Sequence, residues 1–314
     1  MKYIKDFKEG DRVIDYYLCR DKQMLVTKAG KDYYKLVLED KTGSVNAMVW
    51  EIGPLVSDFA KGDIVKVDGK IQTYQDAPQM TVMKIRKAAE NEVDVSDFFK
   101  TSKVPTEALY KKALGMIEQI KDPALRRLAF YFYRDNDQIA KKLMKHPAAK
   151  NVHHGYLGGL IEHSVSVAQI AVSFRDLYPQ LDQDLLIVGG LLHDIGKLKE
   201  LEPIPMLDYS DAGRLLGHIT MGYQMIHEQG SKMADLDPAK LLNLEHMILS
   251  HHGKLEFASP VVPETMEAMA LNLADLSDSQ LKLMEDAIEA DSLEGNWTSY
   301  NRALERYIYK LDKY

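Results

Sequence analysis

The chain has 314 residues, of which 46% are hydrophobic and 28% charged, and its formal net charge at pH 7 is −7. This composition indicates an ordinary globular chain of two domains or one large one, and it argues against a protein coated in basic surface. No stretch approaches the ~18 apolar residues that a membrane helix needs, so we expect no membrane partner. The single cysteine excludes an internal disulfide framework, and the N-terminus lacks the apolar region of a signal peptide, which together predict a cytoplasmic protein.

Charges and histidines are unevenly distributed along the chain. Residues 1–90 carry 16 Lys and Arg against 14 Asp and Glu, a net charge of +2, whereas the remainder has a net charge of −9. A weakly basic first part permits nucleic-acid binding without requiring it. All ten histidines lie between His146 and His252. Such clustering of potential ligands is what a metal site requires.

Residues 1–90 show the period-two alternation of β-strands. The strand-like segments are 33–40, 44–50, 63–74 and 79–88. Gly43 predicts a hairpin turn between the first two, and Asp68-Gly69 divides the third segment into two half-buried parts. About five short antiparallel strands in this length fit a small closed barrel, and an OB-fold is the best single match.

The hairpin of residues 38–47, LEDKTGSVNA, resembles the hairpin that recurs in OB-folds of the anticodon-binding and replication-protein type. The resemblance implies a surface on which exposed aromatic rings stack on bases while lysines follow the phosphates. The candidates for base or phosphate contact are Tyr33, Lys35, Trp50, Lys70, Tyr74 and Lys84. For each aromatic candidate, a place in the core or at the rim of the barrel is the alternative.

After a linker at residues 91–105, the pattern becomes helical, and we expect residues 106–314 to form an all-α domain. The segments 107–120 and 123–146 are amphipathic. Their basic residues indicate a solvated helix face, and the alternative is that they guide a polyanion toward the site. The segment that follows Asp275 also has a helical, amphipathic pattern, with aromatic residues available for packing or for a contact with another subunit. The expected fold class is therefore a small N-terminal β-barrel followed by an all-α domain.

The motif GGLLHDIGK at residues 189–197 places His193 and Asp194 side by side, with Lys197 one helical turn further on. One imidazole nitrogen and one carboxylate oxygen suit Mn²⁺, Fe²⁺ or Zn²⁺ better than Ca²⁺, which prefers oxygen ligands alone. Lys197 is expected on the same helix face as both, so its ammonium can reach an anion bound to that metal. An isolated His-Asp pair is more often a buried helix end.

Further ligand-type residues lie on predicted helices between residues 150 and 280, the expected metal core. They are His163, His218, His251 and Asp275. An unpartnered carboxylate on the apolar helix of Asp275 would be costly to bury, and a metal ion would remove that cost. The order of the residues is thus H, HD, H, HH and D, all on helices.

This order resembles the HD-domain superfamily of metal-dependent phosphohydrolases, defined by H…HD…D and matched here by His163, His193, Asp194 and Asp275. The histidines at 218 and 251 resemble those of members that bind two metal ions. A barrel followed by such a domain, at this length, resembles the YhaM-type 3′-to-5′ exoribonucleases of bacteria. This resemblance covers nearly the whole chain.

The resemblance implies hydrolysis of single-stranded RNA, and also of DNA, from the 3′ end, with release of nucleoside monophosphates. It implies two divalent cations, with Mn²⁺ expected and Fe²⁺, Co²⁺ or Zn²⁺ as alternatives. The cations would lower the pKa of a bridging water and stabilise charge on the phosphoryl group, with Asp194 as the bridging carboxylate. Lys197 would neutralise a phosphate oxygen.

Several other residues are candidates for contact with the substrate or with a ligand. His252, His154 and His153 suit substrate binding or proton transfer, and Arg214, in an expected loop at 199–216, suits phosphate. Glu162 is a candidate to orient a metal ligand. The remaining histidines, His146, His227 and His246, are expected at the surface or in packing.

Two other functions remain open from the sequence. An HD phosphohydrolase acting on free nucleotides would need no strand-binding barrel. The other is a DNA-binding regulatory protein with a dormant HD domain. The complete ligand set argues against it, because loss of catalysis usually leaves gaps in such a set. The sequence leaves the oligomeric state open, including a homo-oligomer.

Overall fold

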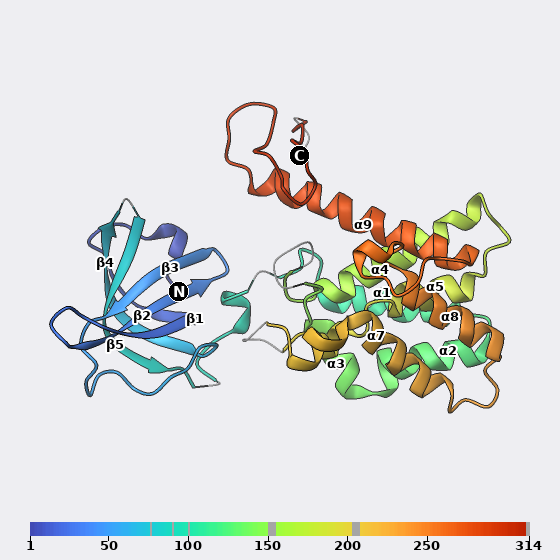
Figure 1. Cartoon of the computed structure of the whole chain (residues 1–314), viewed down its shortest axis with the longest axis horizontal. Helices are drawn as coiled ribbons and strands as arrows, with labels where there is room; N and C mark the ends of the chain where they lie inside the picture. Colours follow the sequence, from blue (N-terminus) through green and yellow to red (C-terminus); the bar gives the residue numbers. More distant parts are fainter. Residues whose placement is uncertain (76, 90, 100, 150–154, 203–207, 312–314) are drawn as a thin grey trace. The chain divides into compact units, whose positions relative to one another are not determined.

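The computed structural model describes residues 1–75, 77–89, 91–99, 101–149, 155–202 and 208–311, and the chain forms two compact units (Figure 1). The first comprises Met1–Thr101, and the second comprises Ser102–Glu202 and Asp208–Tyr314. Among the described residues, no helix is both long enough and apolar enough to cross a bilayer. The expected fold class is confirmed, since the first unit is a β-barrel and the second is helical.

The first unit is a closed five-stranded barrel. Its strands are β1 (Arg12–Val26), β2 (Asp32–Asp40), β3 (Gly43–Val49), β4 (Ile64–Tyr74) and β5 (Ala77–Lys87). They follow the order β1-β2-β3-β5-β4, and β4 pairs again with β1 to close the barrel. The alternating apolar residues that predicted the strands point inward, as Leu36, Leu38, Ala47 and Val49 show.

Three details of the barrel differ from the sequence prediction. The pair β3–β5 is parallel rather than antiparallel, and β1 had not been located individually. The segment 63–74 forms the single strand β4, because Asp68 and Gly69 pair in regular register with Ile14 and Val13 of β1. The register shift opposite them lies on β5, where Met83 is the extra residue. A Cβ at Gly69 would come within 2.9 Å of the Thr81 carbonyl oxygen on β5, and Arg12 from β1 neutralises Asp68. Both partners are distant in sequence, so the local pattern could not reveal them.

The second unit consists of helices. Those described are α1 (Thr106–Glu118), α2 (Pro123–Phe130), α3 (Asp137–Lys145), α4 (Gly159–Ser173), α5 (Gln183–Leu192), α6 (Lys197–Glu200), α7 (Asp211–Gly230), α8 (Pro238–Ser250) and α9 (Met266–Ala290). Side-chain caps begin most of them, for example Asp182 before α5 and Thr265 before α9. Their apolar faces form one core, in which α4 and α5 lie side by side (Figure 1).

Three helical predictions need correction. A π-helical turn at Tyr131–Asp135 interrupts the expected helix at 123–146. The expected loop at 199–216 ends earlier, because Ser210 caps α7 and the helix begins at Asp211. At the C-terminal end α9 stops at Ala290, and the described residues beyond it form turns and isolated bridges, with Gly295 in the left-handed region.

Two glycines allow the helices to approach closely enough to build a site. A Cβ at Gly190 on α5 would lie 2.4 Å from the Cα of Ala168 on α4. A Cβ at Gly196 would lie 2.0 Å from the carbonyl oxygen of His218 on α7. Both contacts involve backbone, which cannot move aside as a side-chain end can. The glycines of the GGLLHDIGK motif therefore set the distance from its His-Asp pair to α4 and α7.

We predict that Gly190→Ala destabilises the helical unit far more than Gly189→Ala does. The new methyl group at 190 meets the backbone of Ala168, and overpacking of this kind costs about 1–3 kcal/mol. At 189 it meets the flexible end of Met247, and the gain in helix propensity of about 1 kcal/mol offsets the adjustment. Thermal unfolding of both variants, followed by circular dichroism at the helical band, measures the difference. Equal shifts in Tm would contradict the role of Gly190.

Candidate metal centre

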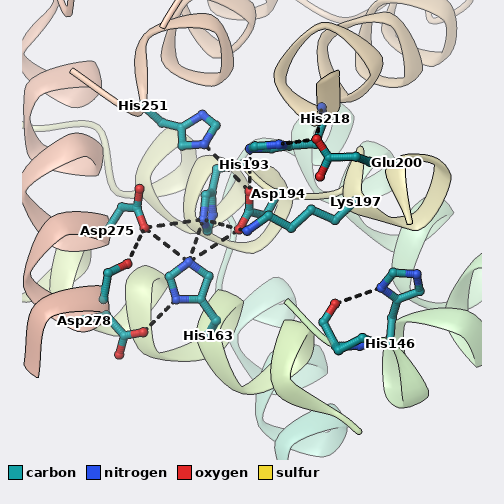
Figure 2. A network of polar contacts seen from close by, with 12 residues as sticks. His146, His163, His193, Asp194, Lys197, Glu200, His218, His251, Asp275 and Asp278 are labelled. Carbon is teal, nitrogen blue, oxygen red and sulfur yellow. Dashed lines mark hydrogen bonds and ion pairs between the residues drawn. The ribbon is translucent and has the colours of Figure 1, made fainter. Parts of the chain in front are cut away.

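Six residues expected as metal ligands converge in the second unit (Figure 2). They come from five helices or helix ends: His163 from α4, His193 and Asp194 from the end of α5, His218 from α7, His251 from the end of α8, and Asp275 from α9. Helix α5 stops at Leu192, so the His-Asp pair lies at its C-terminal end rather than within it. His218 directly follows Gly217, where α7 is interrupted and φ is 71°.

The first group of donor atoms surrounds one carboxylate oxygen of Asp194. The Nε2 atoms of His163 and His193 are 3.1 Å apart, and both lie within 3.5 Å of Asp194 Oδ2. Asp275 Oδ1 is 3.2 Å from His163 Nε2. These side chains could hold one cation with two nitrogens and carboxylate oxygens.

The second group faces the other oxygen of the same carboxylate. His218 Nε2 lies 3.3 Å and His251 Nε2 lies 3.7 Å from Asp194 Oδ1. His252 is close to both histidines, and the three can offer ligand atoms that lie within 4.8 Å of one another. Asp194 therefore presents its two oxygens to two separate sets of imidazoles, as a carboxylate that bridges two cations would.

The donor atoms of the second group fit a cation because they are buried and form no hydrogen bond with the described residues. Among the described residues, four buried side-chain atoms lack a hydrogen-bond partner: Glu162 Oε2, Asp194 Oδ1, His218 Nε2 and His251 Nε2. The last three converge on one another. Burying polar atoms without partners is costly, and divalent cations coordinated by nitrogen and oxygen would satisfy all three.

Each of the four histidines is oriented by a partner at Nδ1, which directs Nε2 into the centre. His193 and His251 use the backbone oxygens of Gly190 and Ile248, at 2.9 and 2.7 Å. For His163 the partner is Asp278 Oδ2 at 2.6 Å, and for His218 it is Glu200 Oε1 at 3.0 Å. Partners of this kind fix the tautomer and ring orientation of a ligating imidazole.

The two orienting carboxylates were missed from the sequence. Asp278 lies three residues after Asp275, on the same face of α9, and this spacing was the available signal. Glu200 also accepts a hydrogen bond from the backbone N–H of His218 at 2.9 Å, a contact that no local pattern reveals. Glu162, which had been the candidate for this task, instead interacts with Tyr156 and Lys282.

Lys197 belongs to the centre, although it does not lie on the same helix as His193 and Asp194, as had been expected. The chain turns between His193 and Lys197, and Lys197 begins the separate helix α6. Its Nζ lies 2.6 Å from Asp194 Oδ2, and both side chains are largely buried. Burial by itself would lower the pKa of the Lys197 ammonium, but the charge of Asp194 outweighs this and raises it.

Burial and the neighbouring charges act in opposite directions on the pKa values of the centre. Burial would raise the pKa of the Asp194 and Asp275 carboxyl groups. Lys197 and the imidazoles of His193 and His218 hold the pKa of Asp194 well below its usual range, and the surrounding imidazoles do the same for Asp275. Burial would lower the pKa of His163, yet its hydrogen bonds to the two carboxylates of α9 raise it to about 9. Burial keeps the pKa of His251 well below its ordinary value, so this ring is neutral and able to bind a metal.

A cavity of about 340 Å³ opens onto this centre. His252 lines it, with its Nδ1 2.8 Å from the carbonyl oxygen of Phe257, and burial lowers the pKa of its imidazole. Arg214 is not among the residues that line the cavity, and its guanidinium contacts Asp208 at 3.2 Å. His153 and His154 lie outside the described residues.

The other histidines take part in packing and hydrogen bonds away from the donor atoms. His146 is buried, with Nδ1 2.8 Å from the Pro147 carbonyl oxygen. His227 pairs with Glu245, and His246 accepts a hydrogen bond from the backbone of Glu264.

On the barrel, the strand-binding candidates fall into two places. The rings of Tyr33 on β2 and Trp50 after β3 stack with centroids 4.9 Å apart and an interplanar angle of 28°. Lys35 is exposed two residues after Tyr33, on the same face of β2. Tyr74 is exposed at the hairpin that joins β4 to β5, on a different pair of strands.

Comparison with known proteins adds three findings. A family model described as the HD domain matches residues 160–280, and one described as the OB-fold nucleic acid binding domain matches residues 19–88. The 3′-5′ exoribonuclease YhaM of Bacillus velezensis is 34% identical over 304 residues, which cover 96% of this chain and 95% of that protein.

Two solved OB domains also align with the chain. The second OB-fold domain of replication protein A from Methanococcus maripaludis has 20% identity and a TM-score of 0.24, and covers 30% of this chain and 98% of its own. An OB domain from Thermoplasma acidophilum has 15% identity and a TM-score of 0.23, and covers 30% of this chain and 90% of its own.

We predict that Glu200→Ala weakens binding of Mn²⁺ by about 10–100-fold, the usual effect of removing the partner that orients a ligand. Glu200 Oε1 bonds both the backbone N–H and the Nδ1 of His218, and the alanine variant loses both hydrogen bonds. Glu200→Gln keeps an acceptor oxygen and should lose less. Calorimetric titration of metal-free protein with Mn²⁺ measures the effect, and Glu202→Ala, at an exposed side chain nearby, is the control. Equal affinities in the two alanine variants would disprove the role of Glu200.

Proposed function

The chain belongs to the YhaM family of 3′-5′ exoribonucleases, and from this premise we propose that it shortens single-stranded RNA at the metal centre of its helical unit. It is a metal-dependent hydrolase with a nucleic-acid-binding OB-fold. The observation that carries the assignment of the reaction to this centre is the position of Asp194. Its two oxygens face two groups of imidazoles, and three donor atoms there are buried without partners.

We assign the donors to two divalent cations. His163, His193 and Asp275 would hold one, His218 and His251 the other, and Asp194 both. Mn²⁺ is our first choice, with Fe²⁺, Co²⁺ and Zn²⁺ as alternatives, because mixed nitrogen and oxygen donors suit these ions. When bound, such cations stabilise negative charge on a phosphoryl group and lower the pKa of water.

Two side chains of the chain itself can assist the reaction. Lys197 lines the cavity beside Asp194, so its ammonium is placed to stabilise a phosphate oxygen that approaches the centre. His252 donates its Nδ1 hydrogen to the Phe257 carbonyl oxygen, which leaves Nε2 as an acceptor for the substrate or a proton. Its low pKa keeps this acceptor available at neutral pH.

The barrel would hold the strand. The Tyr33–Trp50 stack offers aromatic faces to bases, and Lys35 beside it offers charge to a phosphate. We assign Tyr74 to the same task, and His154 and Arg214 to substrate near the metal centre. The functional domains would span residues 1–90 and 106–314, joined by 91–105. DNA as a second substrate, a cytoplasmic location and a homo-oligomer are further parts of the proposal.

Two other functions make different predictions. A nucleotide phosphohydrolase would act on free nucleotides and leave oligomers intact. A DNA-binding regulatory protein with a dormant helical domain would bind a strand after chelation and yield no product in any metal.

We predict that a 5′-labelled single-stranded RNA incubated with the protein and Mn²⁺ gives a ladder that shortens from the 3′ end. EDTA should abolish the ladder, because the donor atoms require a cation to act on phosphate. Denaturing gel electrophoresis of a time course measures this. An RNA that stays intact in both reactions would overturn the proposed function.

We predict that Asp194→Ala lowers kcat by about a thousandfold or more, because loss of the bridging carboxylate removes several kcal/mol of metal-ion stabilisation. Strand binding, measured by fluorescence anisotropy, should stay unchanged because the barrel is a separate compact unit. Asp194→Asn keeps the shape of the side chain and removes its charge, so it should lose hydrolysis as well and serves as a control for misfolding of the alanine variant. Equal loss of hydrolysis and binding in both variants would contradict this division of labour.

A further inference from the structure

Two exposed aromatic side chains stand at the cavity of the metal centre. Tyr209 and Phe257 line it together with His163, Asp194 and Lys197, and their exposed fractions are 42% and 55%. They come from segments far apart in the sequence, one before α7 and one after α8. Single exposed apolar residues need no explanation, but two rings brought to one catalytic cavity do.

We infer that Tyr209 and Phe257 form a stacking site for the 3′-terminal base of the strand. The inference rests on the proposed function and names the part of the substrate that this cavity accepts. A nucleotide whose phosphate lies at the metal centre must place its base one ribose away from that phosphate, within the cavity that these two rings line.

The backbone holds Phe257 in position relative to the centre. Its carbonyl oxygen accepts the hydrogen bond from His252, whose ring belongs to the donor cluster. The next residue, Ala258, adopts φ 64° and ψ 21°, a left-handed conformation that is uncommon for a residue other than glycine. Ser259 then donates through its Oγ to the Leu249 carbonyl oxygen at 3.1 Å and anchors the turn to α8. Strained backbone of this kind is typical of functional sites.

Tyr209 is fixed by a corresponding set of contacts on the other segment. It forms an antiparallel bridge with Leu201, and the N–H of Ser210 donates to the Glu200 carbonyl oxygen at 2.9 Å. Glu200 is the residue that orients His218. Each ring is therefore attached to a segment that also positions a histidine of the centre.

The surroundings of the rings suit a nucleotide. Lys254 Nζ lies 5.3 Å from the centroid of Phe257, and the Arg214 guanidinium lies 5.8 Å from that of Tyr209. A basic group beside an aromatic face matches a ligand that combines a flat base with a phosphate. A volume of about 340 Å³ is at the lower end for ligand pockets, which fits one nucleotide unit.

The rest of the lining favours stacking over recognition of the base edges. Ala148, Ala149 and Leu276 offer no hydrogen-bonding side chain. Asn272 donates to the His251 carbonyl oxygen at 2.8 Å, and Ser279 donates to Asp275. Because every base has a π-face, a site of this type accepts any of the four, as an enzyme that removes successive nucleotides requires.

The test compares two RNA substrates that differ in the terminal base alone. One ends in an ordinary 3′ nucleotide, and the other ends in the same nucleotide without its base. The variants are Phe257→Ala and Tyr209→Ala, with Phe257→Tyr and Tyr209→Phe as versions that retain the ring. Tyr178→Ala, at a ring that is 52% exposed and away from the cavity lining, is the control.

We expect each alanine variant to raise KM for the ordinary strand by about tenfold, the usual effect of losing one base–aromatic contact. On the strand that lacks the terminal base, the same variants should match the wild type. The ring-retaining variants and Tyr178→Ala should behave as wild type on both. Mn²⁺ titration should give unchanged affinity, since neither ring donates to a cation.

Equal losses on both substrates would overturn the inference, because the rings would then support the centre rather than contact the base. Alanine variants that match Tyr178→Ala on the ordinary strand would overturn it as well. A wild-type protein that shortens neither strand would instead overturn the proposed function on which the inference rests. Binding of a nucleoside monophosphate no tighter than ribose 5-phosphate, in the presence of Mn²⁺, would overturn the stacking site independently of strand cleavage.

Discussion

The buried carboxylate of Asp194 is the constraint on which the rest of the helical unit depends. A carboxylate at 2% exposure is stable as an ion only if it is compensated, and Lys197 compensates one of its oxygens. The other oxygen faces His218 and His251 without a hydrogen bond. The surrounding helices must therefore supply compensation to both oxygens, from Lys197 and from the imidazoles that face each of them.

Five helices meet that requirement together, and no two of them could do so alone. Helix α5 ends at Leu192. Gly190 within it lets it approach α4 at backbone distance, and Gly196 after it lets the following turn approach α7 in the same way. The orienting acceptors then act from outside the donor cluster: backbone oxygens for two histidines, and Asp278 and Glu200 for the other two. The geometry of the centre is thus a property of helix packing and of this surrounding layer of acceptors.

The barrel shows which features local sequence patterns can predict and which they cannot. Strands β2 to β5 and the hairpin at Gly43 could be predicted because alternation and turn residues act between neighbours in the sequence. At Asp68-Gly69 the same reasoning failed, because the two residues have the composition of a turn, whereas pairing with β1 keeps them within one continuous strand. The end of α9 failed for a similar reason, since an amphipathic pattern does not show where tertiary contacts cease.

The amino-acid sequence was enough to predict the barrel, the helical unit and the six candidate metal ligands, because strand alternation, helix periodicity and the H…HD…D order are local or nearly local signals. Only the tertiary structure decided which way each donor points. It made Asp194 face two groups, assigned Asp278 and Glu200 to two histidines, and brought Tyr209 and Phe257 to one cavity. These relations join residues up to 115 positions apart, so they arise from packing and cannot be read along the chain.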